Sequence, residues 1–87
     1  MTIRLTAAQR RALRLLATPG AEAILGRSSR WRVMADGVEI GTIYAESLLP
    51  LRVAGLVDML GDRHIHGWRQ RITEAGRAYL ADRQAAP

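Results

Sequence analysis

The residues of this chain best suited to specific chemistry are its basic ones. All 13 positively charged side chains are arginines, and together with 8 acidic residues they give a formal net charge of +5. A guanidinium group stays charged at physiological pH and fits phosphate oxygens with two parallel hydrogen bonds. The charge balance is typical of a small domain that meets an anionic partner. An arginine-only composition is also typical of GC-rich coding DNA.

A second candidate for chemistry is the pair His64 and His66. Alternate residues of a strand point to the same side, but no cysteine or third ligand completes a tetrahedral set, so we predict no metal site. The two histidines would instead gain positive charge below about pH 6.5. Asp58 and Asp62 have no partner base at a recognisable spacing, and no glycine-rich phosphate loop occurs. We therefore expect a protein that is not an enzyme and needs no cofactor.

These residues must be positioned by one small core. The chain has 87 residues, of which 48% are hydrophobic, and no cysteine. This length predicts a single domain over residues 1–87. No apolar stretch is long enough for a membrane span and the N-terminus lacks a signal-peptide pattern, so we expect a cytoplasmic protein that does not enter a membrane. Because phenylalanine is absent, Trp31 and Trp68 are expected to be large core residues.

The first elements have clear local signals. Thr6 to Gln9 has the form of a capping box and predicts a helix from Ala7 to Ala17, stopped by Thr18-Pro19-Gly20. Its expected apolar stripe consists of Ala8, Ala12, Leu13, Leu15 and Leu16, with Arg10, Arg11 and Arg14 on the outer side. Ala21 to Leu25 is interpreted as one or two further helical turns. Alternation from Arg30 to Tyr44 around Asp36-Gly37 predicts a β-hairpin.

The second half of the chain predicts a helix, two strands and a last helix. Ser47 to Ala54 reads as a short helix with Ser47 as a possible N-cap and Gly55 at its end. Pro50 requires that this helix begin near Glu46 or Ser47, or that a longer helix kink there. Strands are predicted at 56–60 and 68–72 around a polar tip at 61–67. Thr73 is expected to cap a helix over 74–83 that buries Ala75, Ala78, Tyr79 and Leu80, with residues 84–87 frayed.

This order of elements resembles a winged helix-turn-helix domain. Two strings carry the resemblance, Gly55-Leu56-Val57 and the segment 72–80 with its Thr-Glu-Ala-Gly start. They are similar to the end of the recognition helix and the exit from the wing in MarR-like and PadR-like transcriptional regulators. The resemblance implies a small α+β fold with an N-terminal helix, a hairpin, a short recognition-type helix, a two-stranded wing and a C-terminal helix. The hairpin at 30–44 departs from this pattern, because such regulators usually have a helix there.

The resemblance also implies double-stranded DNA as the partner. The 47–54 helix would approach the major groove, and the 61–67 tip would contact the backbone or the minor groove. Strand alternation places further arginines together on the wing and the first hairpin, where they would bind phosphates. The candidate DNA-binding residues are Ser47, Arg52, Arg30, Arg32, Arg63, His64, Arg69 and Arg71.

We therefore expect a small bacterial or phage transcriptional regulator, a monomer or weak homodimer, that contacts DNA mainly through phosphates. The alternative is a winged-helix module that binds protein, such as a phage-encoded inhibitor or an adaptor, because the 47–54 helix is apolar and poor in charge. An exposed patch of Leu48, Leu49 and Val53 would favour a protein partner. Burial of these residues, with arginines lining one face, would favour DNA.

Overall fold

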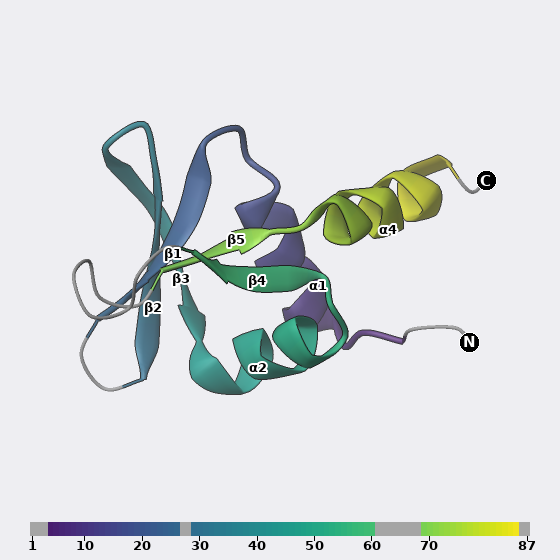
Figure 1. The fold of residues 1–87 in the computed structure, drawn as a ribbon, viewed down its shortest axis with the longest axis horizontal. Helices are drawn as coiled ribbons and strands as arrows, with labels where there is room; N and C mark the ends of the chain where they lie inside the picture. Colours follow the sequence, from purple (N-terminus) through teal and green to yellow (C-terminus); the bar gives the residue numbers. More distant parts are fainter. Residues whose placement is uncertain (1–3, 27–28, 61–68, 86–87) are drawn as a thin grey trace.

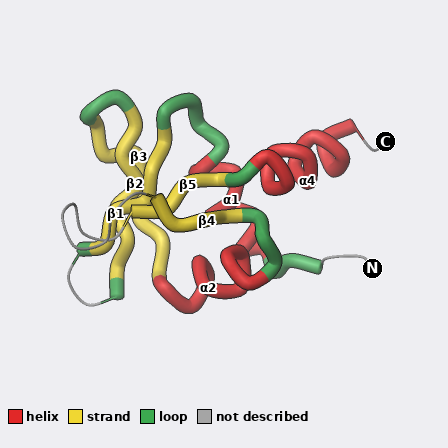
Figure 2. Tube along the Cα trace, in the orientation of Figure 1, coloured by secondary structure: helices red, strands yellow, loops and turns green. Residues whose placement is uncertain are grey.

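The computed structural model describes residues 4–26, 29–60 and 69–85. This part of the chain forms an α+β fold of three helices and one antiparallel five-stranded sheet (Figures 1 and 2). The strand order across the sheet is β3-β2-β1-β5-β4, so β1 is central. The elements are α1 (Ala7–Leu16), β1 (Ala21–Leu25), β2 (Arg30–Ala35), β3 (Val38–Tyr44), α2 (Ala45–Val53), β4 (Val57–Leu60), β5 (Arg69–Ile72) and α4 (Glu74–Ala85).

Helix α1 confirms the capping-box prediction. The backbone N–H of Gln9 donates to the Thr6 hydroxyl over 3.1 Å, and the Thr6 N–H donates to the Gln9 side chain over 2.9 Å. Of the predicted apolar stripe, Ala12, Leu13 and Leu16 are buried. Leu15 is only half-buried and Ala8 is exposed. The helix therefore presents a narrower apolar face to the sheet than the sequence pattern indicated.

The prediction of helical turns at Ala21–Leu25 was wrong, because this segment is the central strand β1. It pairs with β2 along one edge and with β5 along the other. Alanine and glutamate favour helices intrinsically, but pairing on both edges outweighs that preference of a fraction of a kcal/mol per residue. The short side chains of Ala21 and Ala23 are buried beneath the helices.

The predicted hairpin is confirmed as β2 and β3. Asp36 and Gly37 have φ values of 51° and 79°, the left-handed conformations of a type I′ turn that matches the twist of the two strands. Trp31 and Val33 are buried at 6% and 0% exposure, which confirms Trp31 as a core residue. Trp68 lies outside the described residues.

Helix α2 begins at Ala45, earlier than predicted, and Ser47 is not its N-cap. The strand sets this start, because Tyr44 still pairs with Arg30 and has extended backbone angles before the chain turns directly into the helix. Pro50 lies inside the helix rather than in its first turn. The proline nitrogen has no hydrogen to donate to the carbonyl of Glu46, so α2 lacks one internal hydrogen bond.

The end of α2 is joined tightly to the start of α4. Gly55 has φ +80°, and the N–H groups of Gly55 and Leu56 donate to the carbonyls of Arg52 and Leu51 in a Schellman motif. The Thr73 hydroxyl donates to the Gly55 carbonyl over 2.7 Å and accepts from the Gly76 N–H over 3.0 Å. Thr73 is therefore the predicted N-cap of α4 and also connects the two helices.

Helix α4 is longer than expected and less buried. It extends to Ala85 rather than ending near Arg83 as predicted. Leu80 is buried and Tyr79 half-buried, whereas Ala75 and Ala78 are exposed, contrary to the prediction. Figure 1 shows why: α4 leads away from the sheet toward the C-terminus, so only one side of its first turns meets the rest of the fold.

The two faces of the sheet have different surroundings. Helices α1 and α2 contact the same face (Figure 1), and the core lies between them and the strands. The buried side chains on this covered face include Ala23, Trp31, Val33, Val57 and Ile72. The intervening residues of the strands point to the opposite face, which no helix of the described residues covers and which we call the open face. In the described residues, no helix is both long and apolar enough to cross a membrane.

Candidate nucleic-acid interface

Four of the predicted DNA-binding arginines lie together on the open face of the sheet. Arg30 and Arg32 alternate with buried Trp31 and Val33 along β2, and Arg71 is exposed beside buried Ile72 on β5. Arg69 points to the same side and is half-buried. We call Arg30, Arg32, Arg69 and Arg71 the arginine face.

The strand register arranges the arginine face as a diagonal line. Ile24 of β1 is opposite Arg32 on one side and opposite Arg69 on the other, so these three residues form one row across the sheet. Because β2 and β5 are both antiparallel to β1, they run in the same direction. Arg30 and Arg71 therefore extend the row toward opposite ends of the sheet. Ordinary strand spacings give a length of about 16 Å from Arg30 to Arg71.

Acidic residues share this face. The Arg32 Nε lies 3.7 Å from a Glu39 carboxylate oxygen, and the Arg69 guanidinium lies 3.3 Å from Glu22. The first pair is largely exposed, with 58% and 47% of its side chains accessible, so it contributes little to stability and is screened by salt. The second pair is more enclosed and fixes Arg69 against β1. These two carboxylates lower the positive potential of the arginine face.

The ends of the diagonal are less neutralised than its centre. Within the described residues, neither Arg30 nor Arg71 forms an ion pair. The Arg30 guanidinium lies 5.8 Å from the centre of the Tyr44 ring, a cation–π distance that leaves its charge available. Arg71 is opposite Asp58 in the β4–β5 register; Asp58 Oδ1 accepts a 2.8 Å hydrogen bond from the Met59 backbone, but the carboxylate keeps its negative charge beside Arg71. Arg30 is thus the arginine of this face with the least acidic surroundings, and Arg71 is exposed without a direct ion pair among the described residues.

Comparison of the chain with protein-family models, with curated proteins and with solved structures finds no match. The interpretation of the arginine face therefore depends on its own residues.

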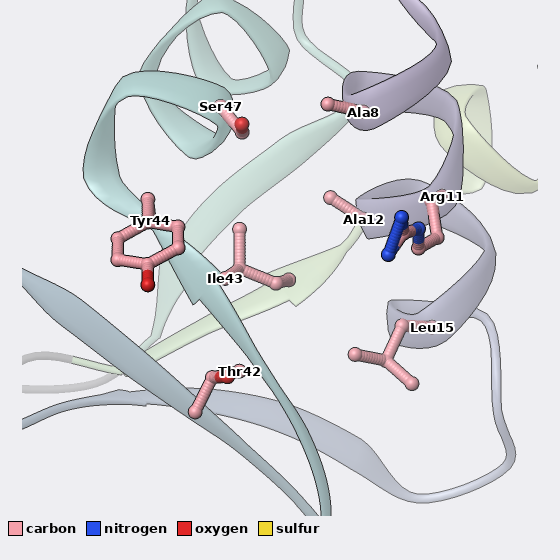
Figure 3. Close-up of a pocket in the computed structure, with 8 residues that line it drawn as sticks. All are labelled: Ala8, Arg11, Ala12, Leu15, Thr42, Ile43, Tyr44 and Ser47. Carbon is pink, nitrogen blue, oxygen red and sulfur yellow. The ribbon is translucent and has the colours of Figure 1, made fainter.

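The remaining predicted site residues are not on the arginine face. Ser47 and Arg52 belong to α2, which covers the opposite face of the sheet. Ser47 is half-buried and lines a cavity of about 260 Å³ between α1, β3 and α2, which Figure 3 shows with Arg11 and Tyr44 at its sides. Arg52 is exposed in the last turn of α2. Arg63 and His64 lie outside the described residues.

The structure therefore divides the predicted interface into two surfaces. One is the arginine face, and the other is the outer side of α2, where Arg52 is the only basic side chain of that helix. Because the sheet lies between them, one straight duplex does not contact both surfaces. The outward arginines of α1, which are Arg10, Arg11 and Arg14, are exposed as predicted and lie on the helix-covered side.

Sequence reasoning missed one polar residue of the covered face. Gln70 lies on the same side of its strand as Ile72 and is 3% exposed, and within the described part of the chain its Oε1 has no hydrogen-bond partner. Strand alternation indicates the direction of the Gln70 side chain, but nothing in the sequence indicates that its Oε1 lacks a hydrogen-bond partner. Gln70 lines a second cavity, beneath α2, which is separate from the arginine face.

Proposed function

We propose that this protein binds double-stranded DNA through phosphate contacts made by the arginine face. The observation that carries the proposal is the placement of four arginines from two separate strands in one line on the uncovered side of the sheet. A line of about 16 Å spans a length of duplex that carries roughly nine phosphate charges at one per 1.7 Å. The spacing of the exposed arginines is therefore compatible with several phosphate contacts along an unbent duplex.

Such contacts position a protein on DNA but carry no base sequence. The residues of the arginine face are long and charged, and the face lacks the protruding helix that usually enters the major groove. The proposed activity is therefore binding with weak dependence on base sequence. A small bacterial or phage regulator that acts by covering DNA fits this activity.

The winged-helix arrangement is also part of the proposal. Helix α2 leads through Gly55 into β4, and β4, β5 and β1 are neighbours in the sheet, as the order recognition helix, wing and first strand requires. The β2–β3 hairpin takes the place of the helix that usually precedes the recognition helix. In this arrangement α2 takes the chain position of the recognition helix, but the proposed DNA contacts are made by the arginine face, on the other side of the sheet.

Charge-matched variants test which surface binds. Fluorescence anisotropy of a labelled duplex is measured with the wild type, with the double variant Arg30→Ala/Arg71→Ala, and with Arg10→Ala/Arg14→Ala. Both double variants lose two positive charges, but the second pair lies on α1, on the helix-covered side. We expect the first variant to bind all duplex sequences more weakly than the second. Equal affinities of the two variants would place the interface elsewhere, and no binding by the wild type at low salt would refute DNA as the partner.

A second candidate function is suggested by the outer side of α2. Leu49 and Val53 are 53% and 78% exposed, while Leu48 is buried at 1%. An exposed patch of Leu48, Leu49 and Val53 was expected for a protein partner, and burial of these residues with arginines lining one face was expected for DNA. Each expectation is met in part, because an exposed apolar patch and an arginine surface are both present. A protein partner would bind the patch at Leu49 and Val53. Leu49→Ser/Val53→Ser would then abolish binding of a protein partner and leave DNA affinity unchanged.

A further inference from the structure

A second cavity lies between the sheet and α2, on the side opposite the arginine face. Its volume is about 250 Å³, and most of its lining is apolar, with Trp31 from β2 and Leu48 and Leu49 from α2. Glu46 and Arg52 also line it, and both are exposed residues of α2. For comparison, an apolar cavity of about 150 Å³ is large enough to bind benzene. The cavity therefore has room for a molecule of two fused rings.

One wall of this cavity is polar and unsatisfied. Gln70, which is 3% exposed, belongs to the lining, and its Oε1 has no hydrogen-bond partner among residues 4–26, 29–60 and 69–85. A buried amide oxygen without a partner is rare in folded proteins, because it loses its hydrogen bonds to water without replacement. A ligand that donates a hydrogen bond to this oxygen would satisfy it. The strand fixes its position, since Gln70 is paired with Ala23 on one side and Met59 on the other.

The lining defines the chemistry of the ligand. A carboxamide carries an oxygen acceptor and an N–H donor side by side, and a half-turn of its last torsion exchanges them. It pairs best with a molecular edge that also has an adjacent donor and acceptor. The ring of Trp31 favours a planar partner. Glu46 and Arg52 contribute one charge of each sign, which favours a neutral one.

We infer that this cavity binds a small, neutral, two-ring heterocycle with an N–H and a C=O on neighbouring ring atoms, that is, a fused lactam. The inference does not depend on DNA binding. Trp31 and Gln70 point to the covered side of the sheet, whereas the arginines adjacent to them in sequence point to the open side. A base in a DNA strand that lies on the arginine face cannot reach the cavity, so the ligand is a free small molecule.

The test uses 2-quinolinone, a neutral two-ring lactam, and its N-methyl derivative, which lacks the N–H. Each is titrated into the full-length ¹⁵N-labelled protein while the Trp31 indole and Gln70 side-chain amide resonances are followed. We expect 2-quinolinone to bind roughly 2- to 10-fold more tightly than the N-methyl probe, the effect of one hydrogen bond. In Gln70→Met this preference should disappear.

Two further variants keep the test decisive. Ala45 is a half-buried residue of the cavity lining, so Ala45→Leu should occupy part of the space and weaken binding of both probes even if Gln70→Met does not fold. Ser47→Ala, which alters the other cavity, should leave both affinities unchanged. Absence of a saturable shift at Trp31 and Gln70, an unchanged preference in Gln70→Met, or undiminished binding by Ala45→Leu would overturn the inference. Arg30→Ala/Arg71→Ala should bind the probes normally, which separates this result from that on DNA.

Discussion

Replacing Gln70 by methionine is predicted to stabilise the ligand-free protein. The side chain is 3% exposed and its Oε1 is unsatisfied. An unpaired buried polar atom costs about 1–3 kcal/mol, and an apolar group of similar shape removes that cost. Methionine has the length of glutamine and adapts to irregular packing. We therefore expect the free energy of unfolding to rise by about 1–3 kcal/mol.

Urea and thermal unfolding followed by far-UV circular dichroism measure this change. In a domain of this size, each 1 kcal/mol raises Tm by roughly 4–8 °C, so an increase of at least about 4 °C is expected. Gln70→Ala is the control, because it removes the same polar atom but enlarges the cavity and should not stabilise. A Tm of Gln70→Met at or below that of the wild type would refute the reasoning, since it would mean that the amide is satisfied in solution.

Three further predictions concern packing, capping and charge. Gly76→Ala should cost about 3 kcal/mol or more in urea unfolding, because its Cβ would clash with the backbone carbonyl oxygen of Leu56. Gly41→Ala should cost less than half as much, because its Cβ would meet only the side chain of Leu15, which can move. Thr73→Val should lower the free energy of unfolding by about 2 kcal/mol, whereas Thr73→Ser should stay close to the wild type; equal losses would contradict the bridging role of the hydroxyl. Glu39→Gln should free Arg32 and tighten DNA binding in anisotropy titrations, and unchanged or weaker binding would exclude Arg32 from the interface.

Much of the fold could be predicted from the sequence because its signals are local. The capping box at Thr6, the Asp36-Gly37 turn and the Gly55 helix end each specify a backbone conformation within a few residues. Each has the predicted geometry in the structure. The cap at Ser47 failed because the end of β3 determines where α2 begins, and a strand end is set by its partner.

The predictions that were wrong or missing concern features that depend on contacts between segments far apart in the sequence. Strand β1 begins with three helix-favouring residues, Ala21, Glu22 and Ala23, and its pairing with two neighbours in the sheet determines its conformation. The pair β2–β3 and the pair β4–β5 were each predicted from the sequence. That β1 joins the two pairs into one sheet was not predicted. Strand alternation correctly predicted that Arg69 and Arg71 lie together, but it could not show which face of the sheet the helices cover. Because α2 packs on one face of the sheet and the arginine face is the other, Arg52 and the arginine face lie on opposite sides.

The salt dependence of DNA binding tests the central claim most directly. If between two and four arginines of the arginine face contact phosphates, the slope of log K against log salt concentration should be about −1.8 to −3.6. Removing Arg30 and Arg71 should make this slope less steep by about 1.8, while removing Arg10 and Arg14 should leave it unchanged. Equal slopes for the wild type and Arg30→Ala/Arg71→Ala would contradict phosphate binding by the arginine face.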